Sequence, residues 1–257
     1  YRKYLDKHLA GILQDPKVDV ESKSEILYAS AHGLMRDLFE DPEMEAGLAR
    51  SRDVVRCTIG FMYHNRTALR HLITAAATDY QLYTHAVNGF VLGLGLAWRA
   101  GLGTPKELAE FGTGALLRDL GMMKVPASIR EFKGKLTVSQ FEVLKRHAEF
   151  SEETAKSLGD VGPVALDLIR HHHERLDGTG YPDRLVGTNS RPLVRALTIA
   201  DTFDALTTHR PHQAPMKSFE ALRLMRTRMV GELDQELLNV FIRMLGNPEI
   251  DARLMTA

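Results

Sequence analysis

One segment of the sequence carries an unusual density of groups that can bind a metal ion. RHHHERLDGTGYPDRL, residues 170–185, places three consecutive histidines before Glu174 and then a loop that contains Gly178, Gly180 and Pro182. Neutral imidazole is a common ligand of divalent metals, and three clustered imidazoles beside a tight turn have little structural use. The segment predicts a metal site, and it raises the question whether that site cleaves a ligand or only holds one.

Histidines and aspartates elsewhere in the chain can complete such a site. Imidazole and carboxylate ligands together suit Fe, Mn, Zn or Ni, whereas a structural zinc site or an iron–sulfur cluster would use thiolates, and Cys57 is the single cysteine. Successive residues of a helix point about 100° apart, so adjacent histidines reach one metal only at a helix end or an irregular turn. The candidate ligands are His85, Asp119, His147, His172, His173 and Asp201.

The other histidines are expected to be surface or hydrogen-bonded core residues, because a lone histidine on a helix is seldom a ligand. This group comprises His32, His64, His71, His209 and His212. His171 is expected to point away from the pair that follows it.

The sequence pattern predicts helices for nearly all of the segments that must position these ligands. Apolar residues of residues 24–41 recur at spacings of three and four, and no segment shows the sustained alternation of a half-buried strand. Asp41 and Pro42 resemble an N-cap and first-turn pair. Thr137 and Gln140 form a capping-box pattern that predicts one helix running on through His147. We therefore expect an all-α helical bundle, with a boundary near residue 75 that separates an N-terminal helical region, 1–74, from residues 75–257.

Composition narrows the classes of function. The 257 residues carry 33 basic and 33 acidic side chains, so no basic field favours DNA or RNA. The apolar run from Phe90 to Trp98 is about half of the ~18 residues that a membrane-spanning helix needs. No signal peptide is visible, and the lone cysteine suits a reducing compartment. We expect a cytoplasmic protein without a membrane segment.

The segment HHERLDGTGYPDRLVG from His172 resembles the signature of HD-GYP domains, a branch of the HD phosphohydrolase superfamily that linearises cyclic di-GMP. The resemblance extends over residues 75–245 and includes THAVNG, ALLRDLGMMKVP, GKLTVSQFEVLKRH and ALTIADTFDALTTHRP. It implies an HD-superfamily helical bundle with metals at its centre and a pair of metals that drives attack on a phosphodiester.

The resemblance also implies a role for each matching position. One metal would be held by Asp119, His147, His172 and His173, and a neighbouring metal by His85, Asp119 and Asp201. Substrate contacts would come from Tyr181, Arg210, Gly180 and Asp177. The loop around Tyr181 would also be the place where GGDEF-type cyclases dock.

The sequence departs from the family where the His-Asp pair is expected. Here the pair reads Arg118-Asp119, and Met122 replaces a lysine. A guanidinium offers only donors and stays protonated, so Arg118 cannot ligate a cation. Arg118 could instead take the place of the missing cation and pair with Asp119 or Asp201. The alternative is that the helix shifts and His171 or Glu174 becomes the ligand.

Three further positions differ from the family pattern. His212 and Gln213 stand where the family has an aromatic residue and a lysine, and the neutral Gln81 stands where three-metal members carry a glutamate, so we expect no third metal. We expect one or two divalent metals per chain, Fe or Mn, with Asp119 and Arg118 at the catalytic position.

Three hypotheses result. The first is a catalytically impaired receptor of cyclic di-GMP or a related cyclic dinucleotide, the second is an active metal-dependent cyclic di-GMP phosphodiesterase, and the third is a purely structural interaction module. A homodimer is compatible with each of them.

Overall fold

The computed structural model describes residues 2–42, 46–76, 81–208 and 214–246. Regular secondary structure in these ranges is helical, with isolated β-bridges at Asp177–Val186 and Val230–Leu233, so the all-α expectation is confirmed. The first half contains α1 (Arg2–Gln14), α2 (Val20–Glu40), α3 (Gly47–His64), α4 (Ala68–Ala75), α5 (Leu82–Arg99), α6 (Pro105–Leu117) and the 3-10 helix η1 (Leu120–Lys124). The second half contains α7 (Ala127–Arg130), α8 (Val138–Lys145), α9 (His147–Ser157), α10 (Pro163–His171), η2 (Gly187–Asn189), α11 (Pro192–Thr207), α12 (Ser218–Arg228) and α13 (Gln235–Gly246).

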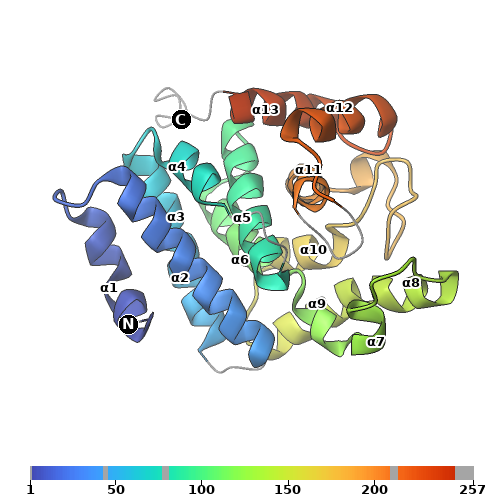
Figure 1. The fold of residues 1–257 in the computed structure, drawn as a ribbon, viewed down its shortest axis with the longest axis horizontal. Helices are drawn as coiled ribbons and strands as arrows, with labels where there is room; N and C mark the ends of the chain where they lie inside the picture. The colour runs from blue at the N-terminus through green and yellow to red at the C-terminus, as the bar shows by residue number, and fades with distance from the viewer. Residues whose placement is uncertain (1, 43–45, 77–80, 209–213, 247–257) are drawn as a thin grey trace.

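Helix α5 is the central element of the bundle (Figure 1). Its residues from Thr84 to Ala97 are all buried, and α2, α6 and α11 pack around it. A helix that is apolar on every side needs such complete cover. The apolar run that begins at Phe90 is therefore a core helix. Among the described residues, no helix is both long and apolar enough to cross a membrane.

Capping side chains define several helix starts. Thr104 and Glu107 form a reciprocal capping box at the start of α6, where Pro105 takes the first helical position. The capping box predicted for Thr137 and Gln140 is confirmed at the start of α8. These pairs satisfy backbone N–H groups that have no partner within the helix.

Two helix boundaries differ from the prediction. Asp41 closes α2 as its C-cap, with its N–H donated to the carbonyl of Asp37, and the next helix begins only at Gly47. Asp41 and Pro42 are therefore not a helix start. The helix from Thr137 does not run on through His147, because the chain turns at Arg146 and His147 begins α9. The turn places His147 at a helix start, where its ring is not confined to one face of a long helix.

The N-terminal region forms a layer of helices on one side of the bundle (Figure 1). Helix α2 packs on α5, α3 packs on α6, and one continuous apolar core includes residues of both regions. A buried hydrogen bond of 2.7 Å from the Tyr28 hydroxyl to Asn88 Oδ1 also joins them. The division near residue 75 stays a prediction, and the described part of the N-terminal region depends on the bundle for its packing.

Candidate metal centre

The end of α10 brings two of the predicted ligands together. The helix ends at His171, and His172 is its fully buried C-cap residue. His172 Nδ1 lies 2.9 Å from the carbonyl oxygen of Ile169, which can only accept, so Nδ1 carries the proton and Nε2 faces inward. Burial lowers the pKa of His172 to about 4. Burial, followed by the charge of His172, likewise holds the pKa of His173 well below its ordinary value. Both rings are therefore in the neutral form that binds metals.

His147 and Asp119 face the same point. His147 Nδ1 donates to the carbonyl of Leu144 over 2.8 Å, which leaves Nε2 free to face His172 Nε2 at 3.3 Å. Asp119 Oδ1 lies 3.5 Å from His147 Nε2 and 3.8 Å from His172 Nε2. Burial alone would raise the pKa of Asp119, but the charge of Arg118 and then of His85 holds it well below its ordinary value.

This arrangement fits a divalent metal. Ligand atoms about 2.1 Å from a tetrahedral metal lie about 3.4 Å from one another. Suitable atoms of Asp119, His147, His172 and His173 all lie within 4.8 Å of each other. In addition, Asp119 Oδ2 is buried and accepts no hydrogen bond within the part of the chain that the structure describes. Its charged neighbours are Arg118 Nε at 3.4 Å and His85 Nε2 at 3.9 Å, so Oδ2 faces the second predicted set, whereas Oδ1 faces the histidines. We call Asp119, His147, His172 and His173 the ligand quartet.

The second predicted set, His85, Asp119 and Asp201, also lies within 4.8 Å, but it is already occupied by positive charge. His85 Nε2 lies 3.0 Å from Asp201 Oδ1, and Nδ1 lies 2.6 Å from Asp204 Oδ2. Burial opposes a charge on His85, yet the carboxylate of Asp201 and the hydrogen bond with Asp204 raise the pKa of His85 to about 9. The ring is therefore protonated near neutral pH in the absence of a metal.

Arg118 supplies the other positive charge of this set. Its side chain is fully buried, Nε and Nη2 both lie 3.0 Å from Asp201 Oδ1, and Nε lies 3.4 Å from Asp119 Oδ2. Its remaining hydrogen bonds go to the backbone carbonyls of His85, Ala86 and Ala115. Burial opposes its charge, but the carboxylates of Asp119 and Asp201 outweigh burial and raise the pKa of Arg118. The guanidinium therefore lies among the carboxylates that the resemblance assigns to the second metal.

The neighbouring helix α5 leaves room for this guanidinium. A β-carbon at Gly89 would lie 2.5 Å from Arg118 Nη2 and 2.8 Å from Cζ and Nη1. The end of an arginine can usually move aside, but here it is held by the five partner groups described above, two carboxylates and three backbone carbonyls. The space at Gly89 shows that the bundle is built around the buried arginine.

The alternative ligands His171 and Glu174 form hydrogen bonds outside the metal centre. His171 Nδ1 lies 2.6 Å from Asp167 and Nε2 lies 2.8 Å from Asp183. The Glu174 carboxylate accepts the backbone N–H groups of residues 183–185 at 2.7 to 2.9 Å. Glu174 therefore holds the loop that follows Pro182, and neither residue replaces Arg118 as a ligand.

A cavity of about 260 Å³ opens beside the quartet. His85, Asp119, His147 and His173 form part of its wall, together with Tyr181 and a set of apolar side chains. The Tyr181 ring lies 4.7 Å from the His173 ring at an angle of 34°. A ligand in this cavity would contact both the metal ligands and the tyrosine.

Cationic side chains that the sequence did not single out also lie at this cavity. Arg130 lines it and donates to the carbonyl of Met122, and Lys145 Nζ lies 5.8 Å from the Tyr181 ring centroid. Met122 itself is part of the wall. Arg130 lies outside the motifs, and Lys145 lies within GKLTVSQFEVLKRH without a role assigned to it, so only the fold reveals their position.

Asp177 and Gly180, which are also predicted to bind substrate, do not line this cavity. Asp177 Oδ1 accepts from the N–H and hydroxyl of Thr179 and so shapes the loop. Gly180 packs against the backbone, where a β-carbon would lie 2.5 to 2.6 Å from atoms of residues 173–175. Arg210 lies outside the described residues. The substrate-binding roles of these three residues stay predictions.

Comparisons with known proteins agree with this architecture. A family model described as HD domain matches residues 96–237, more than half of the chain. A cyclic di-GMP phosphodiesterase of Pseudomonas aeruginosa is 30% identical over 223 residues, which cover 86% of this chain and 53% of that protein. A 3′3′-cGAMP-specific phosphodiesterase of Vibrio cholerae is 35% identical over 149 residues, which cover 58% of this chain and 34% of that protein.

The fold likeness covers nearly the whole chain. A Bdellovibrio bacteriovorus protein described as an HDG"Y"P protein superimposes with a TM-score of 0.81 and 22% identity, over 96% of this chain and 79% of that one. The chain spans about half the length of the Pseudomonas relative and about a third of the Vibrio relative. With its family match and its GYP-containing loop, the chain belongs to the HD domain family, in the HD-GYP branch.

Proposed function

We propose that this chain is a domain of cytoplasmic cyclic di-GMP signalling that holds one divalent metal and binds a cyclic dinucleotide without rapid turnover. The observation that carries the proposal is the place of Arg118, fully buried among Asp119 and Asp201. Together with a protonated His85, it supplies the positive charge that a second cation would otherwise bring. A second metal would have to enter against both charges.

The ligand quartet would hold the metal, Fe or Mn by the resemblance, and the bound metal would polarise a phosphodiester oxygen. Arg118 adds fixed positive charge, but it cannot accept a proton from an attacking water, because it stays protonated. Tyr181 presents a ring on which a purine base can stack. Arg130 and Lys145 offer charged donors for the phosphates. The side chains therefore support binding better than cleavage.

The second candidate is an active cyclic di-GMP phosphodiesterase that yields the linear dinucleotide. The complete quartet favours it, as do Asp119 Oδ2, which accepts no hydrogen bond from the described residues, and relatives that are named as phosphodiesterases. Under this alternative the guanidinium moves aside when a second metal enters. Docking of a GGDEF-type cyclase and homodimer formation stay predictions of the resemblance and of the sequence.

Metal content per chain, measured by elemental analysis after anaerobic loading with Mn or Fe, separates the two candidates. We expect one metal in the wild type, none in His173→Ala, and two in Arg118→His together with a large gain in hydrolysis of cyclic di-GMP. Arg195→His is the matched control, because Arg195 pairs with Asp234 at 2.7 Å outside the metal centre.

Other outcomes reject the proposal. Two metals and rapid hydrolysis in the wild type would show an active enzyme. A folded, metal-loaded wild type that binds no cyclic dinucleotide in calorimetry would instead support the structural module.

A further inference from the structure

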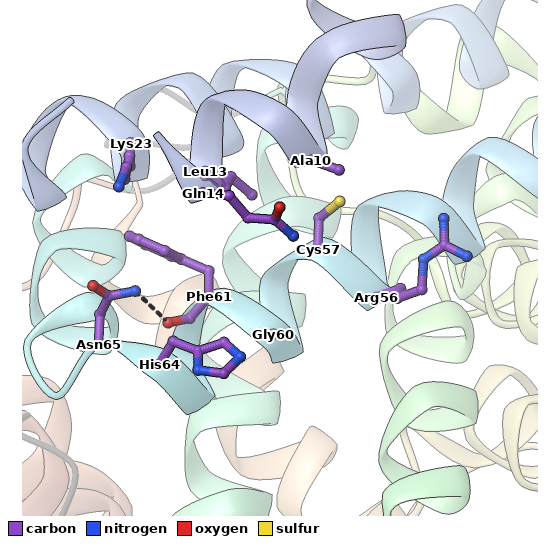
Figure 2. Close-up of a pocket in the computed structure, with 10 residues that line it drawn as sticks. All are labelled: Ala10, Leu13, Gln14, Lys23, Arg56, Cys57, Gly60, Phe61, His64 and Asn65. Carbon is purple, nitrogen blue, oxygen red and sulfur yellow. Dashed lines mark hydrogen bonds between the residues drawn. The ribbon is translucent and has the colours of Figure 1, made fainter. Parts of the chain in front are cut away.

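The N-terminal layer contains a cavity of about 600 Å³ that shares no lining residue with the metal centre. Helices α1, α2 and α3 enclose it, as Figure 2 shows, with Lys23 and Asn65 on one side, Arg56 on the other, and Gln14, Cys57 and His64 between them. The buried part of its wall is apolar and includes Leu13 and Phe61. The cavity is large enough for a small organic molecule.

Lys23 is the unusual group in this wall. Its residue is only 7% exposed, and it has no hydrogen-bond or ion-pair partner in the described part of the chain. The stem of Lys23 is buried, but its ammonium nitrogen is not a buried atom and so reaches open space at the cavity.

The other charges of the wall do not supply that partner. Arg56 is already paired with Asp53 at 2.7 Å, and His64 at the mouth is a further nitrogen base. No carboxylate is among the described residues that line the cavity. The wall therefore combines an apolar interior with one uncompensated cation.

We propose that this cavity binds a small amphipathic carboxylate, with the carboxylate on Lys23 and the apolar part against Leu13 and Phe61. Charge complementarity selects the anion, and the apolar wall selects a ligand with a hydrocarbon part. The site gives the N-terminal layer a ligand of its own. This inference does not rest on the function proposed for the metal centre.

The single cysteine provides a direct readout. Cys57 is half-buried in the cavity wall, so an occupant should shield it from a neutral alkylating reagent such as iodoacetamide. Burial raises the pKa of its thiol, so the labelling rate is best followed at mildly alkaline pH, by mass spectrometry. Octanoate is the probe, and 1-octanol is its uncharged counterpart.

We expect saturating octanoate to slow the labelling of Cys57 at least tenfold, and octanol to need at least tenfold higher concentration for the same protection. Lys23→Met should abolish the preference for octanoate, while Lys23→Arg should retain it. Lys17→Met, an exposed change close in sequence, is the matched control and should behave as wild type.

Equal protection by octanol and octanoate in the wild type would overturn the assignment of an anion. Absence of protection by either probe would overturn the site itself. Circular dichroism checks that Lys23→Met is folded, and Lys23→Arg carries the test if it is not. Metal content is unaffected in every arm, so failure here is distinct from failure at the metal centre.

Discussion

Replacing Arg118 with methionine tests the charge argument at the metal centre directly. Methionine keeps most of the apolar stem but removes the donors to Asp201 and to three backbone carbonyls. Removing one partner of a buried ion pair typically costs about 3 to 5 kcal/mol, because an uncompensated charge stays behind. Since domains are stable by about 5 to 15 kcal/mol, the variant should fold but lose a large share of its stability.

Urea unfolding followed by circular dichroism at pH 7, with EDTA present, measures this loss. Arg50→Met is the matched control, because Nη1 and Nη2 of Arg50 lie 3.1 and 3.2 Å from Asp37 while both side chains remain partly exposed. Exposed pairs contribute about 1 kcal/mol or less. We therefore expect Arg118→Met to cost at least three times as much as the control.

Adding Mn²⁺ extends the same experiment. Ligand at a hundredfold excess over its dissociation constant stabilises a folded protein by about 2.7 kcal/mol per site. Arg118→Met should gain more from Mn²⁺ than the wild type does, because the carboxylates of Asp119 and Asp201 have lost their fixed cation. Equal costs for the two arginine variants in EDTA would refute the charge argument, and equal gains from Mn²⁺ would show that no second position opens.

Three further outcomes are expected from urea unfolding. Gly89→Ala should destabilise the wild type by about 1 to 3 kcal/mol through overpacking. The same substitution should lower the free energy of unfolding clearly less in an Arg118→His background. Equal losses in the two backgrounds would show that the two positions are not coupled. Glu174→Gln should lower stability, because the carboxylate accepts three backbone N–H groups, and should leave the metal content at the wild-type value; loss of metal would make Glu174 a ligand. Burial would raise the pKa of Glu152, but hydrogen bonds from Lys156 and Arg170 outweigh it and lower the pKa. The stability from Glu152 is then present above the unfolded-state pKa and lost as the pH falls, so Glu152→Gln should cost stability at pH 7 and little near pH 3; a cost independent of pH would exclude this ion pairing as its source.

Much of the helical architecture follows from local patterns in the sequence. The apolar spacing of residues 24–41 and the capping box at Thr137 act within a few residues, and both are found in the structure. The end of α8 was not predictable, because no proline or glycine marks the turn at Arg146. The prediction for Asp41 was wrong because an aspartate before a proline can either end one helix or start another.

The metal centre was predictable in its members but not in its charge balance. The quartet joins Asp119, which precedes η1, with residues from α9 and the end of α10, and only the family resemblance assigned them to one metal. Arg118 was recognisable as a departure from the family. Its five partner groups and the space left by Gly89 are properties of packing between helices, and no pattern within α5 or α6 encodes them.

The contact between Gly89 and Arg118 also limits the order in which these two positions can change during evolution. Histidine at position 118 is compatible with Gly89, because a smaller side chain only vacates space. Once alanine occupied position 89, however, a return to arginine would carry the overpacking cost of about 1 to 3 kcal/mol unless glycine were restored first. A lineage could thus leave the arginine state in one step, but a single later substitution on another helix would make the reverse step destabilising.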